Sequence, residues 1–322
     1  MDREITYIEA VRETFRAAMT KDETVFIIGE DVKIGIFATT RGLYEEFGPQ
    51  RVLNSPICEN AIIGTAIGAA MSGMRPVAQL MFADFVYLAM DEIANQAGQW
   101  HYITGGQLKV PLVIEIPTGA RGSSGYNHSQ SPEASFIHPP GLKVVCPSTP
   151  RDAKGLLWTS IFDDNPVLFF EHRRLLALKD NVPVEVYEIP FGVADVKREG
   201  KHATIVAYGW MVHQALKAAQ KMELEGIHLE VIDLRTLVPL DMETIYTSLE
   251  KTGRLVIVEE CRKRGGVGAE ISAAVLEEKM DLLDAPVRRV SAPNIPIPFS
   301  PPLEEAYLPR DEDIIRAVKS IL

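Results

Sequence analysis

The sequence predicts an α/β protein of two domains, each a mostly parallel sheet flanked by helices. Short apolar runs alternate along the chain with longer segments of helical period, which is typical of parallel strands joined by crossover helices. This regularity is lost between Leu175 and His202, where prolines and a glycine separate charged residues. The 322 residues are enough for about two domains of ordinary size, each with its own core.

In the N-terminal half the predicted strands are short, apolar and bounded by turn residues. They are residues 25–28, 77–82, 112–116, 142–145 and 167–170. After the fourth of these, Thr149 places a capping hydroxyl before Pro150, and Asp152 falls in the first turn. We therefore expect a helix over residues 150–162.

The alternation resumes in the C-terminal half. Strands are expected at residues 204–207, 229–232, 255–258 and 287–290, and helices near 212–225, 241–251, 268–279 and 311–321. The predicted domains are therefore residues 1–180 and 203–322, joined by a linker at 181–202. Residues 292–302 are dense in proline, which fixes its own φ and disfavours helix in the residue before it, so an extended surface strap is expected.

Charge and cysteine content exclude several classes of protein. With 33 basic and 44 acidic residues the net charge is -11, and no basic run exceeds residues 262–264, so nucleic-acid binding is not expected. Three widely spaced cysteines predict neither a disulfide framework nor a zinc site, and a reducing cytoplasm is the expected location. No run of about 18 apolar residues predicts a membrane span.

Glu59 is the first candidate functional residue. It precedes a segment in which Gly64, Gly68 and several alanines recur at helical spacing. Because glycines cost a helix stability, its small face is expected to lie against another helix, of this chain or a second one. The residues alone leave two interpretations of Glu59 open: it complements the positive end of the helix, or it is catalytic.

His128 is the second candidate. It lies in a glycine-rich loop, residues 119–130, that follows a predicted strand, and such loops carry sites in α/β folds. The loop matches neither the GxGxxG nor the GxxxxGK phosphate-binding pattern. A histidine that only caps the loop stays an alternative. There is no GxSxG motif, and Cys58 has no cationic neighbour in sequence, so nucleophilic hydrolysis is disfavoured.

A series of sequence blocks, taken together and in order, is more specific than any one motif. The blocks are residues 28–32 (IGEDV), 40–43 (TRGL), 47–48, 51–52, 56–70, 73–76 (GMRP), 128–130 (HSQ), 140–145 (PGLKVV), 152–157 (DAKGLL), 164–166 (DNP), 231–236 (VIDLRT) and 283–286 (LDAP). In this order they resemble the beta subunits of thiamine-diphosphate-dependent 2-oxo acid dehydrogenases. The resemblance spans nearly the whole chain. It implies a transketolase-like pyrimidine-binding domain followed by a transketolase C-terminal domain, with the cofactor bound between chains.

The resemblance assigns roles to particular residues. Glu59 would hydrogen-bond the pyrimidine ring of thiamine diphosphate and promote the tautomer that deprotonates the thiazolium carbon. Phe85 would pack against that ring with Met81 nearby, whereas the residues alone suggest only core packing for this segment. His128 would contact the substrate and assist transfer to a lipoyl group. A potassium site, made mostly of backbone carbonyls, would be formed by Leu112, Ser160, Ile161, Asp163 and Asn165.

The resemblance also implies partners. The GDG and later Asn by which thiamine enzymes hold Mg²⁺ and diphosphate are absent from this sequence, so an alpha subunit would supply them in a two-alpha two-beta heterotetramer that serves a lipoyl-bearing acyltransferase. The expected reaction is oxidative decarboxylation of a 2-oxo acid, of the pyruvate dehydrogenase type. Oxidative cleavage of acetoin is the alternative. A ketol-transferring transketolase half and a non-catalytic scaffold subunit are more distant ones.

Overall fold

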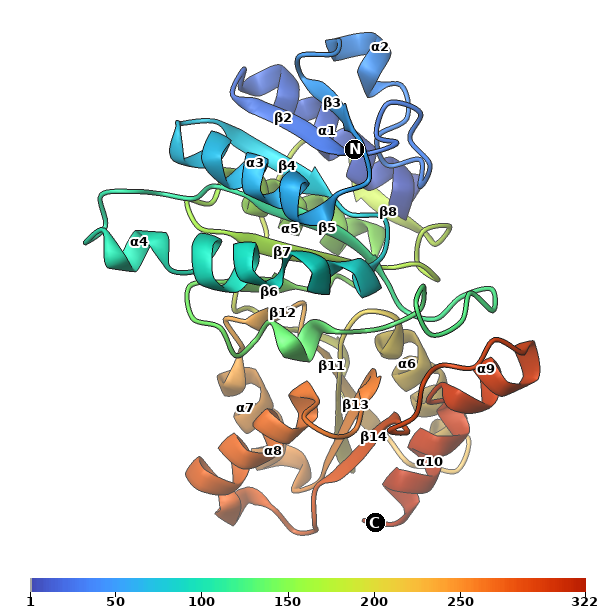
Figure 1. The fold of residues 1–322 in the computed structure, drawn as a ribbon. Helices are drawn as coiled ribbons and strands as arrows, with labels where there is room; N and C mark the ends of the chain where they lie inside the picture. The colour runs from blue at the N-terminus through green and yellow to red at the C-terminus, as the bar shows by residue number, and fades with distance from the viewer. Residues whose placement is uncertain (1) are drawn as a thin grey trace.

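The computed structural model describes residues 2–322 and shows two α/β parts, each with a sheet at its centre (Figure 1). The strands of the N-terminal sheet are β2 (Val25–Glu30), β3 (Val52–Ser55), β4 (Arg75–Gln79), β5 (Val113–Thr118), β6 (Lys143–Val145), β7 (Val167–His172) and β12 (Thr236–Val238). Their order is β12-β6-β7-β5-β4-β2-β3, and only the β12–β6 pair is antiparallel. The predicted parallel sheet is confirmed.

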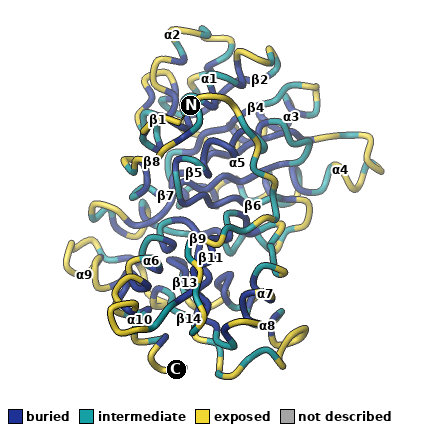
Figure 2. Tube along the Cα trace, turned by 180° about the vertical axis from the view of Figure 1, so that it is seen from behind, coloured by how far each residue is buried: buried dark blue, intermediate teal, exposed yellow. Residues whose placement is uncertain are grey.

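Helices cover both faces of this sheet. The helical elements here are α1 (Tyr7–Lys21), α2 (Leu43–Phe47), α3 (Glu59–Met71), η1 (Ala83–Ala89), η2 (Glu92–Ala97), α4 (Trp100–Ile103), η3 (Glu133–Ser135) and α5 (Pro150–Phe162). Successive strand residues point to opposite faces, so Val25 and Ile27 pack with α1 and α5, whereas Phe26 and Ile28 pack with α3, η1 and η2. The central strands β5 and β7 are accordingly buried along their whole length, whereas the edge strand β3 is partly exposed (Figure 2).

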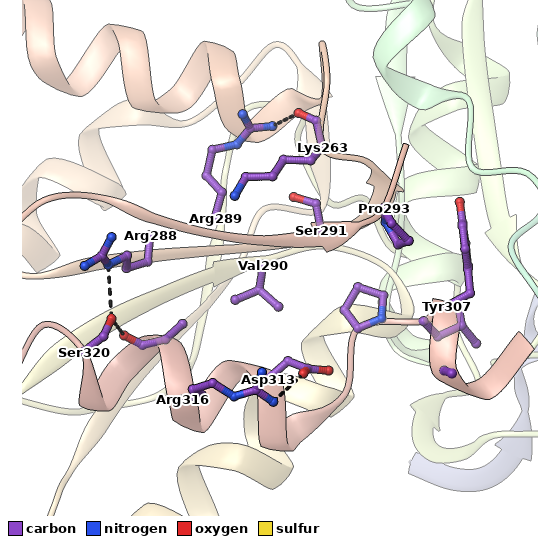
Figure 3. A pocket seen from close by; sticks show the side chains of 14 residues that line it. Lys263, Arg288, Arg289, Val290, Ser291, Pro293, Tyr307, Asp313, Arg316 and Ser320 are labelled. Carbon is purple, nitrogen blue, oxygen red and sulfur yellow. Dashed lines mark hydrogen bonds and ion pairs between the residues drawn. The ribbon is translucent and has the colours of Figure 1, made fainter. Parts of the chain in front are cut away.

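The C-terminal part repeats this arrangement. Its strands are β9 (Asp195–Arg198), β10 (Ala203–Ala207), β11 (Leu229–Asp233), β13 (Leu255–Arg262) and β14 (Arg288–Ala292), in the order β14-β13-β10-β11-β9. Its helices are α6 (Trp210–Glu223), α7 (Met242–Thr252), α8 (Val267–Glu278), η4 (Met280–Leu282), α9 (Pro301–Tyr307) and α10 (Asp311–Lys319). A cavity of about 520 Å³ lies beside the edge strand β14, lined by Lys263, Arg288, Arg289 and Arg316 among others (Figure 3).

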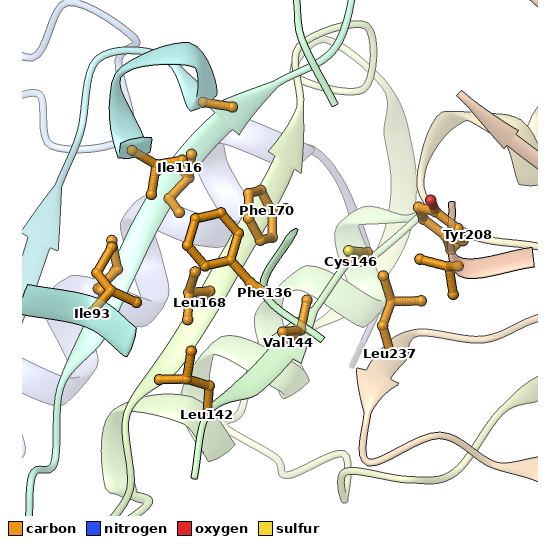
Figure 4. Packing of buried hydrophobic residues seen from close by; sticks show 14 of the residues in the cluster. Ile93, Ile116, Phe136, Leu142, Val144, Cys146, Leu168, Phe170, Tyr208 and Leu237 are labelled. Carbon is orange, nitrogen blue, oxygen red and sulfur yellow. The ribbon is translucent and has the colours of Figure 1, made fainter. Parts of the chain in front are cut away.

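One apolar cluster joins the two parts. Phe170 of β7 and Val144 of β6 belong to the same buried cluster as Tyr208 and Leu237 from the C-terminal half, with the Cys146 thiol among them (Figure 4). Apolar burial contributes about 25 cal/mol per Å², so this shared cluster stabilises the contact between the two parts. No helix within residues 2–322 is long and apolar enough to cross a membrane.

Several local predictions are confirmed and others are wrong. The predicted helix is α5, and the Thr149 hydroxyl accepts a hydrogen bond from the Asp152 amide as expected. The irregular segment 175–202 instead contains β9 and β8 (Lys179–Pro183), and β8 pairs antiparallel with β1 (Asp2–Thr6). Such short edge strands are held by backbone pairing and need no amphipathic period.

Two boundaries also differ from expectation. The strand predicted over residues 77–82 ends at Gln79, and a 3₁₀ turn starts at Ala83. The proline-rich strap is extended only to Ser300, because Pro301 and Pro302 open α9. Proline is tolerated in a first helical turn, where the amide that it lacks would have no partner within the helix.

Candidate active site

The predicted site residues follow the carboxyl ends of neighbouring parallel strands. β3 leads into α3 and Glu59, β4 leads into Met81 and Phe85, and β5 leads into the loop that carries His128. Parallel strands end at the same edge of a sheet, so the segments that follow them converge there. The structure thus brings segments 59–71, 81–89 and 119–130 to one edge of the N-terminal sheet.

Glu59 is buried in the first turn of α3, with 8% of its surface exposed. Within residues 2–322, no group donates a hydrogen bond to its carboxylate. Burial raises the pKa of Glu30 at the end of β2, and the negative charges of Asp31 and then Glu59 raise it further. Buried carboxylates are normally paired, so the free hydrogen-bonding capacity of Glu59 suits a ligand.

Four aromatic rings form a wall at the same edge. The Phe82 ring lies edge-on to Phe85, with centroids 5.9 Å apart, and to Phe37, with centroids 5.4 Å apart. The His128 imidazole contacts both Phe82 and Phe85, at centroid distances of 4.6 and 5.3 Å. Met81 is half-buried next to Phe82 in the chain. Phe85 and His128, predicted separately, therefore belong to one cluster, and η1, which carries Phe85, packs against the Glu59 helix.

The loop that carries His128 is held at both ends. Gly119, Gly122 and Gly125 have φ values of +84°, +73° and +75°, which explains its glycines. The Ala120 amide donates to the Glu260 carboxylate of β13 at 2.7 Å. The Gln130 amide donates to both Asp84 oxygens at 3.3 Å.

Only one of the two ring nitrogens of His128 has a hydrogen-bond partner in the described chain. Its Nδ1 lies 3.0 Å from Asn127 Oδ1. In the described chain, no group hydrogen-bonds its Nε2, so this nitrogen is available to a ligand. A role limited to capping the loop would not require the imidazole to lie against Phe82 and Phe85.

Four carbonyls of the predicted potassium site, those of Leu112, Ser160, Ile161 and Asp163, already have hydrogen-bond donors. The Arg75 guanidinium donates to the Ile161 carbonyl at 3.2 Å and to the Asp163 carbonyl at 2.9 Å. The Leu112 and Ser160 carbonyls accept from backbone amides, and the Asp163 carboxylate pairs with a lysine. A carbonyl oxygen has a second lone pair, so a cation bound here would share these oxygens with Arg75.

Sequence reasoning missed Phe37, Arg173 and Glu30 as parts of this edge. Phe37 carries no local signal, because its contact with Phe82 joins loops 45 residues apart. Arg173 follows β7, and the rule that sites gather at carboxyl ends of parallel strands could have identified it. The cavity beside β14 is lined by none of the predicted site residues.

Comparison with known families matches both parts of the chain. The transketolase pyrimidine-binding domain matches residues 3–179, and the transketolase C-terminal domain matches residues 192–314. Among solved structures, the fold is similar to a split gene transketolase described as an inactive beta4 tetramer. The TM-score is 0.79 at 26% identity, covering 99% of this chain and 98% of that one.

Comparison with curated proteins gives several relatives whose sequence identities to this chain are nearly equal. The chain is 45% identical to a pyruvate dehydrogenase E1 component subunit beta of Rickettsia felis, covering 99% of this chain and 98% of the relative. It is 43% identical to the 2-oxoisovalerate dehydrogenase subunit beta of Bacillus subtilis, with 98% of each covered. It is also 43% identical to the acetoin:2,6-dichlorophenolindophenol oxidoreductase subunit beta of Bacillus subtilis, covering 100% and 98%.

Proposed function

Because this chain belongs to the family of beta subunits of 2-oxo acid and acetoin dehydrogenases, built from transketolase pyrimidine-binding and C-terminal domains, we propose that it is the beta half of a pyruvate dehydrogenase type enzyme. With an alpha subunit it would catalyse oxidative decarboxylation of a 2-oxo acid and acyl transfer to lipoyl groups. Acetoin cleavage is the second candidate, since an acetoin relative matches all of the chain at 43% identity.

The observation that carries this proposal is Glu59, a mostly buried residue whose carboxylate has no hydrogen-bond partner in residues 2–322. The site fits thiamine diphosphate: Glu59 would hold the pyrimidine ring, and Phe85 with Met81 would flank it and exclude water. When bound, the cofactor supplies a carbon nucleophile and an electron sink for cleavage next to a carbonyl. Glu59 contributes a proton held at a fixed place away from water.

His128 would act on the substrate side of the same pocket. Its free Nε2 can donate or accept a proton, and Phe82 and Phe85 fix the plane of the ring. We assign it contact with the substrate and assistance in acyl transfer to the lipoyl group. Its replacement by glutamine should lower turnover more than cofactor affinity.

The exposed face of α3 supports assembly with other chains. Asn60, Ala61, Gly64, Thr65 and Gly68 are exposed along one side of this otherwise apolar helix. A Cβ built on Gly68 would meet no atom within 4 Å, so the chain itself does not require glycine there. The proposed assembly is a two-alpha two-beta heterotetramer whose alpha chains hold Mg²⁺ and diphosphate, and its acceptor is a lipoyl-bearing acyltransferase.

Three further assignments stay predictions. The domains are proposed as residues 1–180 and 203–322 with a linker at 181–202, and the location as cytoplasm, where three free thiols persist. The potassium site at Leu112, Ser160, Ile161, Asp163 and Asn165 is tested by melting the chain in KCl, NaCl and choline chloride of equal ionic strength. If potassium binds at this site, the Tm should be higher in KCl than in NaCl or choline chloride.

The experiment that tests the proposed function is an assay of acceptor reduction by co-purified alpha and beta chains. The panel is pyruvate, branched 2-oxo acids and acetoin, with thiamine diphosphate, Mg²⁺ and the Glu59→Gln variant as control. Activity on one substrate, lost in the variant, would support the proposal and identify the substrate. Assembly without activity on any of them would favour a ketol transferase or a scaffold.

A further inference from the structure

We propose that Arg173 is a positioning residue for His128, because its guanidinium ties the loop that carries the imidazole to the Phe82 ring. Arg173 is half-buried directly after β7, and its amide donates to the Thr118 carbonyl at 2.9 Å. Its backbone is therefore fixed to the end of β5, at the base of the loop. The inference rests on the proposed function only in giving His128 a role in turnover.

The Arg173 guanidinium makes three hydrogen bonds to the loop. Nη1 donates to the His128 carbonyl at 2.6 Å. Nη2 donates to the Arg121 carbonyl at 3.2 Å and to the Ser124 hydroxyl at 3.3 Å. One side chain therefore binds both residues 121–124 and His128, which favours a fixed separation between these two parts of the loop.

The same guanidinium faces the aromatic wall. Its carbon lies 5.0 Å from the centroid of the Phe82 ring, and this ring also contacts the His128 imidazole at 4.6 Å. Cation and ring attract each other in this arrangement. Arg173 thus fixes the backbone of His128 and the ring against which its imidazole rests, and the position of the imidazole follows from both.

Only arginine suits this arrangement. A guanidinium is a flat fork, so it can donate from two nitrogens at its edge while its face covers an aromatic ring. A lysine ammonium is a single point of charge and cannot reach the His128 and Arg121 carbonyls from one position over Phe82. Nη1 and Nη2 make all three of these hydrogen bonds to loop acceptors. The end of the Arg173 side chain is therefore bound to the loop.

The first test measures the loop without reference to activity. Hydrogen–deuterium exchange is followed in the full chain and in the Arg173→Gln and Arg173→Lys variants. We expect amide exchange across residues 119–130 to rise on the order of 10-fold in both variants, with exchange in β5 and β7 unchanged. Unchanged exchange in the loop of a folded variant would overturn the proposal, whether or not the assembled enzyme is active.

The second test asks whether Arg173 acts through His128. In the alpha–beta assembly, Arg173→Gln should lower kcat on the order of 10- to 100-fold with thiamine diphosphate affinity within about twofold of wild type. In the His128→Gln background, the same change should add little, because the group that it positions is gone. Independent, multiplying losses would contradict a positioning role.

Arg121→Gln is the matched control. It removes a neighbouring positive charge and the hydrogen bond that Arg121 Nη1 donates to the Arg173 carbonyl at 3.0 Å, yet it keeps the Arg121 carbonyl and all three donations from the Arg173 guanidinium. If it lowers kcat as much as Arg173→Gln does, the charge or the backbone link of Arg121, rather than the donations of the Arg173 guanidinium, explains the effect and the proposal fails. An inactive wild-type assembly would refute the proposed function. It would not affect the hydrogen–deuterium exchange test of the contacts between Arg173 and the loop.

Discussion

The imidazole of His128 rests edge-on against the ring of Phe82, with centroids 4.6 Å apart and planes at 78°. The two residues are 46 positions apart in the chain and follow different strands, β4 and β5. Edge-to-face contacts of this kind contribute about 0.5–1.5 kcal/mol each. Phe82 also contacts Phe37 and Phe85, so it is the centre of the aromatic wall.

Replacing Phe82 by leucine should therefore lower turnover. The leucine keeps apolar bulk but loses the flat edge that fixes the imidazole, and we expect kcat of the assembled enzyme to fall on the order of 10-fold. Phe37→Leu is the control, because Phe37 contacts Phe82 and not the histidine. Equal losses in the two variants would argue against a specific role of the Phe82–His128 contact.

Phe85→Ala should weaken cofactor binding. Loss of an aromatic face that packs against the pyrimidine ring is expected to raise the Kd for thiamine diphosphate on the order of 10-fold, equivalent to about 1.4 kcal/mol. Titration calorimetry of the alpha–beta assembly measures this change. Tyr87→Phe, which removes an exposed hydroxyl from the same short helix, should leave the Kd unaltered.

Glu133 predicts a pH dependence of stability. Burial, supplemented by the nearby Glu260 carboxylate, raises its pKa from about 4.5 to about 8. The folded state therefore keeps a proton that the unfolded state releases above pH 4.5, so this residue's contribution to stability is lost as the pH rises towards 8, by at most about 1.4 kcal/mol per pH unit.

Glu133→Gln removes that dependence while keeping a group that can accept from Thr118, whose hydroxyl lies 3.1 Å from the carboxyl. The free energy of unfolding of variant minus wild type, from urea titrations at pH 5, 6.5 and 8, should increase steadily with pH. A difference that stays constant across this range would show that Glu133 is already ionised in the folded protein at pH 5.

Substitutions at Gly68 should distinguish effects on the stability of the chain from effects on its assembly with the alpha subunit. Gly68→Ala should stabilise the isolated chain by up to about 1 kcal/mol, because alanine favours helix and the added methyl group meets nothing. Gly68→Leu should also fold, but its side chain would keep the partner away from α3. Size-exclusion chromatography with the alpha subunit should then show separate chains, whereas Glu250→Leu on exposed α7 surface should assemble normally.

The sequence predicted most of what depends on local signals. The Thr149–Pro150 start of α5 and the position of Glu59 at the head of α3 follow from capping and spacing alone. The pairing of β1 with β8 and the addition of β12 to the N-terminal sheet were not predicted, because short strands at sheet edges carry no period that identifies their partners. The His128–Phe82 contact was missed for a related reason: each residue is placed by a different strand.

The central claim is that Glu59 activates thiamine diphosphate, and the exchange rate of the thiazolium C2 proton tests it most directly. In the alpha–beta assembly, the C2 proton of bound cofactor is exchanged in deuterium oxide, quenched with acid and measured by proton NMR. We expect Glu59→Gln to slow this exchange by about 10²- to 10⁴-fold while the cofactor still binds. Wild-type exchange rates in a cofactor-loaded Glu59→Gln assembly would contradict the account.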